Sequence, residues 1–317
     1  MKAAIVKEAK ATPVFGEFDA PKPIKGFEII EVKASALSNM SKRRSEGVHY
    51  TSQSQFPIVA GADGIGITKN GKRVYFAMPE APYGALAEQT LVESKMMIPI
   101  PGHLDTVTTA ALVNPAISGM AALTARGEFV KKQTVLINGA TSTAGTLAVQ
   151  IAKYLGAKKI IATARNKEKL EALKALGADA TIAFNAHNFE ELTYKVMPEI
   201  KDGLDIVLDY IWGNSSTPLM MAIAQVTASK RVNYVIVGEV AGEDVVLPTE
   251  ALRMSAIEIL GSGMRSVPMR KMLRAVKDVF KMTKKVKLSL DLVQIPLEDI
   301  ESAWKLPTQP RVVITIN

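Results

Sequence analysis

A turn that contains two glycines is the stretch of this sequence best suited to chemistry. An apolar run at residues 135–137 precedes it, the turn extends from Gly139 to Gly145, and apolar residues continue at helical spacing over 147–155. A helix that begins after such a turn presents unpaired backbone N–H groups and the positive end of its dipole, which together favour an anion. The pattern predicts a pyrophosphate site typical of dinucleotide binding. The binding residues expected here are Gly139, Ser142, Thr143, Ala144 and Gly145.

The turn departs from the usual glycine pattern at one position. Gly139 can make the tight turn and Gly145 the close contact between helix and strand, but Ser142 or Thr143 stands where a middle glycine would admit the pyrophosphate. A purely structural turn is therefore the alternative interpretation.

The end of the next strand predicts which dinucleotide binds. Thr163-Ala164-Arg165 offers no carboxylate to accept hydrogen bonds from the ribose of NAD, whereas the Arg165 guanidinium matches a ribose 2'-phosphate. We therefore expect NADP(H), with Thr163, Arg165 and Lys169 among its binding residues. The alternative is that Arg165 and Lys167 begin a solvent-exposed helix.

Strand and helix patterns alternate from residue 133 onward. Short apolar runs at 135–137, 160–163, 180–184, 206–209, 232–237 and 257–260 are separated by helical patterns. Such alternation predicts a doubly wound parallel sheet, in which ligands lie beyond the carboxyl ends of the strands. Gly238 and Ser262, which follow two of these strands, are further candidates for cofactor binding.

The two ends of the chain have a different character. Residues 1–115 contain many short strand patterns separated by turn signals, and a basic helix at 269–283 precedes two more strand patterns near the end. We expect a mostly β domain formed by residues 1–115 and 264–317, with the cofactor domain, residues 116–263, inserted into it.

Composition narrows the class of protein. The 317 residues are 48% hydrophobic and 22% charged, as in ordinary globular proteins, and contain no cysteine, so disulfides and thiolate metal sites are excluded. No apolar run approaches the roughly 20 residues of a membrane span, and residues 1–15 lack the apolar block of a signal peptide, so we expect a cytoplasmic protein with no membrane partner. The net charge is +8, but Lys and Arg look scattered, which argues against nucleic acid.

Several motifs in order resemble a known superfamily. They are M-K-A-A-I-V, V-K-A-S-A-L-S-N, F-P-I-V-A-G-A-D-G-I-G, G-K-R-V-Y-F, L-I-N-G-A-T-S-T-A-G and P-R-V-V-I-T-I. Together they are similar to the medium-chain dehydrogenase/reductase superfamily, and most to its zinc-independent quinone oxidoreductase branch, the zeta-crystallin-like enzymes. The resemblance implies an α/β fold, with a Rossmann sheet inserted into a GroES-like, mostly β catalytic domain. It also implies a homodimer or homotetramer, of which we expect the homodimer.

The resemblance also implies which chemistry to expect. The positions that bind zinc in metal-containing relatives match Ser38, Ala62-Asp63 and Asn114, which are not the three firm ligands that zinc needs. Without a Lewis acid to hold an alkoxide, the expected reaction is hydride transfer from NADPH to a quinone or an α,β-unsaturated carbonyl, whose conjugation spreads the incoming charge.

Candidate catalytic residues follow from the same resemblance. Tyr50, Ser38 and Asn39 are expected to supply hydrogen-bond donors for the substrate oxygen, and Asn114 and Ser118 to approach the nicotinamide. The plain alternatives are a flexible surface loop around Tyr50 and helix capping by Asn114 before Pro115.

Two other functions stay open at this point. Some relatives bind NADPH but act as structural or RNA-binding proteins, and the missing middle glycine is compatible with weak catalysis. An acyl-chain enoyl reductase is the other, and it would need a long apolar channel.

Overall fold

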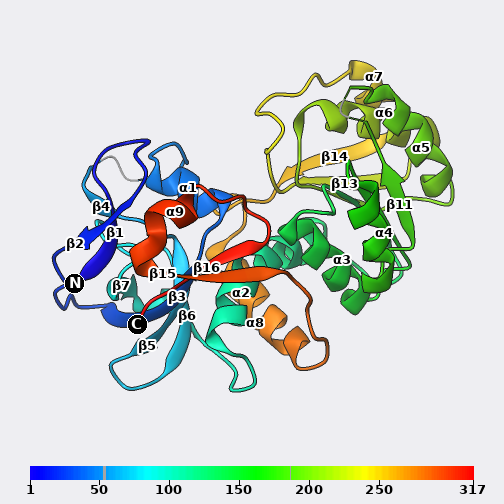
Figure 1. Ribbon diagram of the computed structural model, residues 1–317. Coiled ribbons are helices and arrows are strands. Elements are labelled where there is room, and N and C mark those ends of the chain that lie inside the picture. Colours follow the sequence, from blue (N-terminus) through cyan, green and yellow to red (C-terminus); the bar gives the residue numbers. More distant parts are fainter. Residues whose placement is uncertain (53–54, 186) are drawn as a thin grey trace. The chain divides into compact units, whose positions relative to one another are not determined.

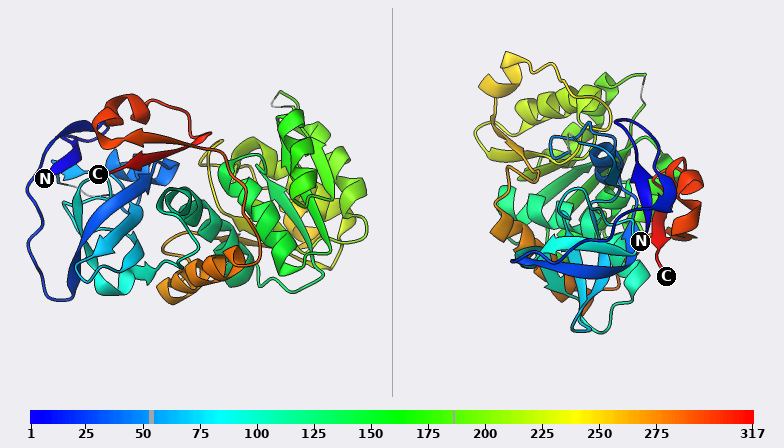
Figure 2. Two further views of the ribbon diagram at one scale, coloured as in Figure 1. Left: turned by 60° about the horizontal axis from the view of Figure 1, so that its bottom comes forward. Right: turned by 90° about the vertical axis from the view of Figure 1, so that its left-hand side faces the viewer.

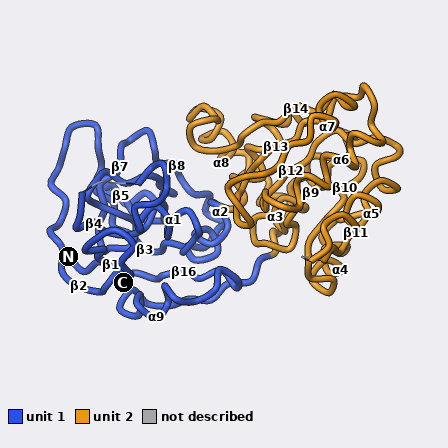
Figure 3. Tube along the Cα trace, turned by 90° about the horizontal axis from the view of Figure 1, so that it is seen from above, with its two compact units in different colours: residues 1–114, 290–317 blue, residues 115–289 orange. Residues whose placement is uncertain are grey.

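The computed structural model describes residues 1–52, 55–185 and 187–317. The chain forms two compact units (Figure 3). Unit 1 contains residues 1–114 and 290–317, and unit 2 contains residues 115–289. Both chain ends therefore belong to unit 1, as Figure 2 also shows.

Unit 1 is built on two mainly antiparallel sheets. The larger has seven strands in the order β15-β16-β3-β5-β6-β8, with β7 paired to β3, and the smaller has the order β2-β1-β4. The strands of unit 1 are β1 (Lys2–Val6), β2 (Val14–Glu17), β3 (Phe27–Ala36), β4 (Ile58–Val59), β5 (Asp63–Thr68), β6 (Arg73–Ala77), β7 (Gln89–Glu93), β8 (Met97–Pro99), β15 (Leu292–Pro296) and β16 (Arg311–Thr315). The last strand of the chain lies inside the larger sheet because β16 pairs with both β3 and β15.

Two short helices complete unit 1, α1 (Asn39–Ser45) and α9 (Ile300–Trp304). Helix α1 lies in the segment for which a surface loop was the alternative expectation. Ser38 begins the helix, because its side chain accepts a hydrogen bond from the N–H of Ser41. Lys42 in its last turn donates to the carbonyl of Trp304 (2.5 Å) and lies 5.7 Å from the centre of the Trp304 ring, which ties α1 to α9.

Unit 2 is a doubly wound parallel sheet (Figure 1), as the sequence predicted. The strand order is β11-β10-β9-β12-β13-β14, and every neighbouring pair is parallel. The strands are β9 (Thr134–Asn138), β10 (Lys159–Ala164), β11 (Ala180–Ala183), β12 (Ile206–Asp209), β13 (Arg231–Ile236) and β14 (Ala256–Gly261). The order reverses between β9 and β12, and this switch point is where ligands of such sheets bind.

Helices cover both faces of this sheet, with α3 and α4 on one face and α5 and α6 on the other (Figure 1). The helices of unit 2 are α3 (Thr143–Leu155), α4 (Lys167–Leu176), α5 (Glu190–Ile200), α6 (Ser216–Val226), α7 (Thr249–Arg253) and α8 (Met269–Thr283). Glycines in the left-handed conformation end α3 and α4, at Gly156 and Gly177. The apolar periodicity of these segments, except for the short α7, made their positions predictable from sequence.

Helix α2 (Thr106–Ala121) and the π-helical turn that follows it (Ala122–Arg126) carry the chain from unit 1 to unit 2. Contrary to our expectation, this segment is long and apolar enough to cross a membrane by length and composition, but 67% of its most apolar window is buried in the protein. Burial of that kind is typical of a core helix.

Unit 2 extends further along the chain than the boundary expected at residue 263. Helix α8 belongs to unit 2, together with the segment up to Ser289. The side chain of Gln150 explains part of this, because its amide donates to the carbonyl of Ser289 (3.1 Å) and accepts from the N–H of the same residue (3.0 Å). Lys271 on α8 also reaches the carbonyl of Ala125 (3.4 Å).

Candidate functional site

The glycine turn of unit 2 delivers the chain from β9 into the N-terminus of α3. Ser142 caps the helix, because its hydroxyl accepts from the N–H of Gly145 (3.0 Å) and donates to the carbonyl of Gly139 (2.9 Å). One side chain therefore closes the turn and satisfies a first-turn donor. Thr143 and Ala144, the first two helical residues, bring their N–H groups to the positive end of the α3 dipole.

Both glycines of the turn occupy positions that a side chain would disturb. Gly139 has φ +84°, and a Cβ there would lie 2.7 Å from a side-chain carbon of Ile211. A Cβ on Gly145 would lie 2.3 Å from the carbonyl oxygen of Gly139 and 2.7 Å from the Cα of Ala140. The first glycine thus makes the turn and the second allows α3 to pack on the strand, which are the roles expected from sequence.

A buried polar network lies directly behind the turn. Its centre is Asp209, the last residue of β12, which has no exposed surface. One carboxylate oxygen accepts from Asn138 Nδ2 and from the N–H groups of Ile211 and Trp212, each at 2.9 Å. The other accepts from the hydroxyls of Ser216 (2.7 Å) and Tyr234 (2.5 Å). We call Asn138, Thr163, Asp209, Ser215, Ser216 and Tyr234 the Asp209 network.

The Asp209 network connects the carboxyl ends of four adjacent strands. Asn138 on β9 bonds to Asp209 on β12 and accepts from the Thr163 hydroxyl on β10 (2.8 Å), and Tyr234 adds β13. The Thr163 carbonyl also accepts from the N–H groups of Gly139 (2.9 Å) and Ala140 (3.1 Å). The network therefore fixes the glycine turn at the switch point of the sheet.

Sequence reasoning did not find this network. Thr163, expected to bind cofactor, lies fully buried behind the turn, and its hydroxyl is directed into the network. Asn138 and Asp209 are polar residues that end two strands, and these strands are neighbours in a doubly wound sheet. This pattern was the available sequence signal for the network.

Arg165 and Lys169 lie at the carboxyl end of β10. Arg165 follows the strand directly, and Asn166 then caps α4 by accepting from the N–H of Lys169 (2.9 Å). Both basic side chains are exposed, and among the residues that the structure describes Arg165 forms no ion pair. The Arg165 guanidinium is therefore available at the strand end where the ribose 2'-phosphate of a dinucleotide would bind.

Gly238 and Ser262 follow β13 and β14 at the same edge of the sheet. A Cβ on Gly238 would lie 2.5 Å from the carbonyl oxygen of Tyr210, so glycine allows the two chain segments to approach. The N–H of Ser262 donates to the carbonyl of Ile236 (2.8 Å). Ser118 on α2 donates to the carbonyl of Pro115 (2.7 Å).

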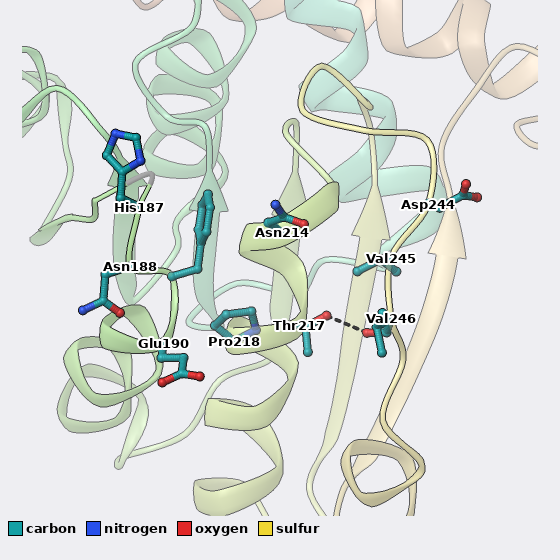
Figure 4. A pocket seen from close by; sticks show the side chains of 10 residues that line it. His187, Asn188, Glu190, Asn214, Thr217, Pro218, Asp244, Val245 and Val246 are labelled. Carbon is teal, nitrogen blue, oxygen red and sulfur yellow. Dashed lines mark hydrogen bonds between the residues drawn. The ribbon is translucent and has the colours of Figure 1, made fainter.

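A cavity of about 690 Å³ opens among the loops after β11, β12 and β13 (Figure 4). Its lining residues are His187, Asn188, Phe189, Glu190, Asn214, Thr217, Pro218, Asp244, Val245 and Val246. Thr217 donates to the carbonyl of Val246 (2.5 Å), which closes one side. Two carboxylates and no Lys or Arg occur among these residues, so the cavity does not suit a phosphate, whereas the α3 N-terminus does.

In unit 1 a second buried carboxylate gathers polar groups. Asp63 accepts from the Tyr75 hydroxyl (3.2 Å) and from Asn114 Nδ2 (3.3 Å), and it lies close to the guanidinium of Arg311. Burial raises the pKa of Asp63 to about 6, against the opposing effects of Arg311, Tyr75 and Asn114. Burial also lowers the pKa of Arg311, whose Nε and Nη2 have no hydrogen-bond partner among the described residues.

The expected catalytic residues lie in unit 1, and the structure joins one of them to this group. Asn114 is half-buried and in contact with Asp63, inside α2 rather than at its start, so the alternative of helix capping by Asn114 is wrong. Ser38 is buried, and its hydroxyl caps α1 and donates to Ser41 Oγ (3.0 Å). Asn39 is exposed at the start of α1, and Tyr50 is 53% exposed with its ring 4.1 Å from that of His49.

The donors at the positions matched to zinc ligands do not fit that metal. Asp63 is the only carboxylate among Ser38, Ala62, Asp63 and Asn114, and it is bonded to Tyr75 and Asn114. Over the described residues, no three His, Cys, Asp or Glu side chains gather in a metal-binding group.

The unit 2 sheet has its glycine turn at the switch point, and both chain ends form a separate β unit. This organisation is typical of two-domain dinucleotide-dependent oxidoreductases. The chain is similar to the quinone oxidoreductase branch of the medium-chain dehydrogenase/reductase superfamily. Residues 144–285 match the family described as zinc-binding dehydrogenase.

Individual relatives agree with this placement. A probable NADPH-dependent quinone reductase of Emericella nidulans is 28% identical, over 96% of either chain. The chloroplastic NADPH-dependent alkenal/one oxidoreductase of Arabidopsis thaliana is 32% identical, over 58% of this chain and 49% of that one. The quinone oxidoreductase of Pseudomonas syringae has the same fold, with a TM-score of 0.84 at 20% identity, over 99% of this chain and 100% of that chain.

Proposed function

We propose that the protein is a zinc-independent, NADPH-dependent oxidoreductase that reduces quinones or α,β-unsaturated carbonyls. The observation that carries the proposal is the capped glycine turn at the switch point, followed by Arg165 at the end of the next strand. The names of the relatives from Emericella nidulans and Arabidopsis thaliana, both NADPH-dependent reductases of these two substrate classes, support it.

Unit 2 would hold the cofactor. The α3 N-terminus, with Gly139, Ser142, Thr143, Ala144 and Gly145, suits the pyrophosphate, because the glycines leave the backbone accessible and the helix dipole favours an anion. Arg165 and Lys169 suit the 2'-phosphate, since a guanidinium binds phosphate in a bidentate manner. Gly238 and Ser262 border the same strand ends, and Ser118 belongs to the same unit. Bound NADPH supplies the hydride.

Residues of unit 1 would serve the substrate. A conjugated carbonyl gains negative charge on its oxygen during reduction, and hydrogen-bond donors stabilise that charge. Tyr50, Asn39 and Asn114 are the candidate donors, and the Asn114 amide keeps a second N–H besides the one it gives to Asp63. The Ser38 hydroxyl already donates to Ser41, so Ser38 orients α1 rather than the substrate.

The direct test is the rate of NADPH oxidation with a panel of quinones and enones, followed by absorbance. We expect turnover that persists after dialysis against a chelator, because the proposed chemistry needs no zinc. NADPH binding without turnover of any acceptor would contradict the proposal. The proposal includes a cytoplasmic homodimer, and light scattering of the purified protein measures its mass.

Arg165 allows a sharper test of the cofactor. Arg165→Ala is expected to weaken NADPH binding by roughly 1.5–3 kcal/mol, the value of a hydrogen bond to a charged group, and to leave NADH binding almost unchanged. Lys158→Ala is a matched control, because Lys158 is exposed just before the opposite, amino end of β10. Equal losses for both cofactors in Arg165→Ala would refute the phosphate assignment.

A further inference from the structure

The positive charge of the chain is concentrated in one segment, contrary to the scattered distribution expected from sequence. Between Met269 and Lys287 lie eight basic residues and one acidic residue, Asp278, so this segment carries +7 of the net charge of +8. The basic residues are Arg270, Lys271, Arg274, Lys277, Lys281, Lys284, Lys285 and Lys287, and we call them the basic stripe.

Five residues of the basic stripe lie on one face of α8 and its C-cap (orange in Figure 1), whereas Lys285 and Lys287 follow the helix. Arg270, Arg274, Lys277, Lys281 and Lys284 recur at intervals of three and four, which places them on one side of a helix over about 21 Å. All eight side chains of the stripe are exposed, whereas Ala275, Val276, Val279, Phe280 and Met282 are buried on the other side. The apolar face of α8 is therefore already used by the fold, and the charged face is presented to solvent.

Lys281 in the last turn of α8 suits the negative end of the helix dipole, but the stability of the fold does not explain the first half of the stripe. Arg270 and Lys271 lie in the first turn of α8, where the helix dipole disfavours positive charge, and that turn contains no acidic residue. Like charges four residues apart, such as Lys277 and Lys281, also destabilise a helix. Only Asp278 opposes them within the helix, at 3.6 Å from Arg274. The arrangement costs stability, and an external anionic surface would offset that cost.

We propose that the basic stripe binds the anionic surface of a lipid bilayer. Six of its eight residues are Lys, whose flexible point charges suit a diffuse negative surface, whereas Arg forks dominate where individual phosphates are recognised. Binding to single-stranded nucleic acid relies on aromatic side chains that stack on bases, and the one aromatic residue of α8, Phe280, is buried. The helix lies on the membrane by charge alone, because its apolar residues are buried in the protein and cannot insert.

Vesicle binding by the full chain tests this proposal and needs neither cofactor nor substrate, so it is independent of the proposed function. The protein is sedimented with vesicles of phosphatidylcholine alone or with about 30% phosphatidylserine, a strongly anionic surface. We expect binding only to the anionic vesicles. That binding disappears at about 1 M salt, where the Debye length is about 3 Å. Absence of binding at low salt, or equal binding to both vesicle types, would overturn the proposal.

Two variants of equal net charge sharpen the test. Lys277→Gln with Lys281→Gln and Lys284→Gln removes the middle of the stripe, and Lys22→Gln with Lys25→Gln and Lys69→Gln removes three exposed charges from unit 1. Each basic residue near such a surface contributes roughly fivefold to binding, so the first variant should bind about a hundredfold more weakly. The second variant should bind like the unchanged protein. Equal loss in both variants, or vesicle binding abolished by a short RNA that the stripe binds more tightly, would overturn the lipid assignment.

Discussion

Asp209 in unit 2 and Asp63 in unit 1 are both buried carboxylates, with 0% and 3% of their surface exposed, but their surroundings differ. Asp209 accepts five hydrogen bonds of 2.5–2.9 Å, two of them from backbone N–H groups. The Asp63 side chain accepts two longer hydrogen bonds, at 3.2 and 3.3 Å. The nearby Arg311 guanidinium has buried nitrogens without hydrogen-bond partners among the described residues.

This difference separates a carboxylate held by short hydrogen bonds from one whose burial is less well compensated. Five short bonds satisfy the lone pairs of Asp209, so the residue fixes the glycine turn and the turn after β12. Asp63 has less compensation for its burial, which raises its pKa to about 6.

The largest expected effect on stability comes from removing the Asp209 carboxylate, which has the more complete set of hydrogen bonds. Asp209→Ala would leave Asn138, Ser216, Tyr234 and two backbone N–H groups without their acceptor in the protein interior. Such a loss is expected to cost more than about 4 kcal/mol of unfolding free energy, measured by equilibrium urea denaturation. Asp209→Asn should recover much of the loss, since the amide oxygen can replace one carboxylate oxygen. Equal stability of the alanine and asparagine variants would show that the network is not what stabilises this edge.

The second effect concerns Asp63 and depends on pH. Its pKa is higher in the folded protein (about 6) than in the unfolded chain (3.8), so the folded state binds more protons in between. Stability should fall as the pH rises from about 4 to above 6, by about 3 kcal/mol for this group. Asp63→Asn should lack that fall. Urea denaturation of both proteins across this pH range tests the prediction, and parallel profiles would contradict it.

The smallest effect compares the two tyrosines that serve these carboxylates. Tyr234 donates to Asp209 at 2.5 Å, and Tyr75 donates to Asp63 at 3.2 Å. Tyr234→Phe is expected to cost roughly 1.5–3 kcal/mol, as for a bond to a charged acceptor, and Tyr75→Phe less, because its bond is longer. The measurement is the shift in unfolding midpoint at pH 8. A larger loss for Tyr75→Phe would reverse our ranking of the two sites.

Regular apolar patterns made unit 2 predictable from sequence. The helix expected at 269–283 coincides with α8, and all six parallel strands were found, because each amphipathic or buried segment carries its own signal. Helix α1 was missed because Asn39–Ser45 has no apolar stripe. That helix depends on the Ser38 cap and on Lys42 binding the carbonyl of Trp304, which is distant in sequence.

The candidate site was predictable only where a local rule applied. Gly139, Gly145 and Arg165 follow from turn geometry and strand order, whereas the Asp209 network requires knowing that β9 lies between β10 and β12. The contact of Asn114 with Asp63 joins positions 51 residues apart in the chain, so no local sequence pattern predicts it. The positive charge of α8 can be found from the sequence alone by counting the basic and acidic residues of each segment.

The position of β16 inside the larger sheet of unit 1 has a consequence for biosynthesis. Unit 2 is one continuous stretch and can fold as soon as it leaves the ribosome, whereas unit 1 lacks the strand between β3 and β15 until residues 311–315 emerge. A chain shortened by those residues should keep a protease-resistant fragment of unit 2 and lose unit 1. Residues 1–114, although synthesised before unit 2, are thus expected to acquire their final shape after it.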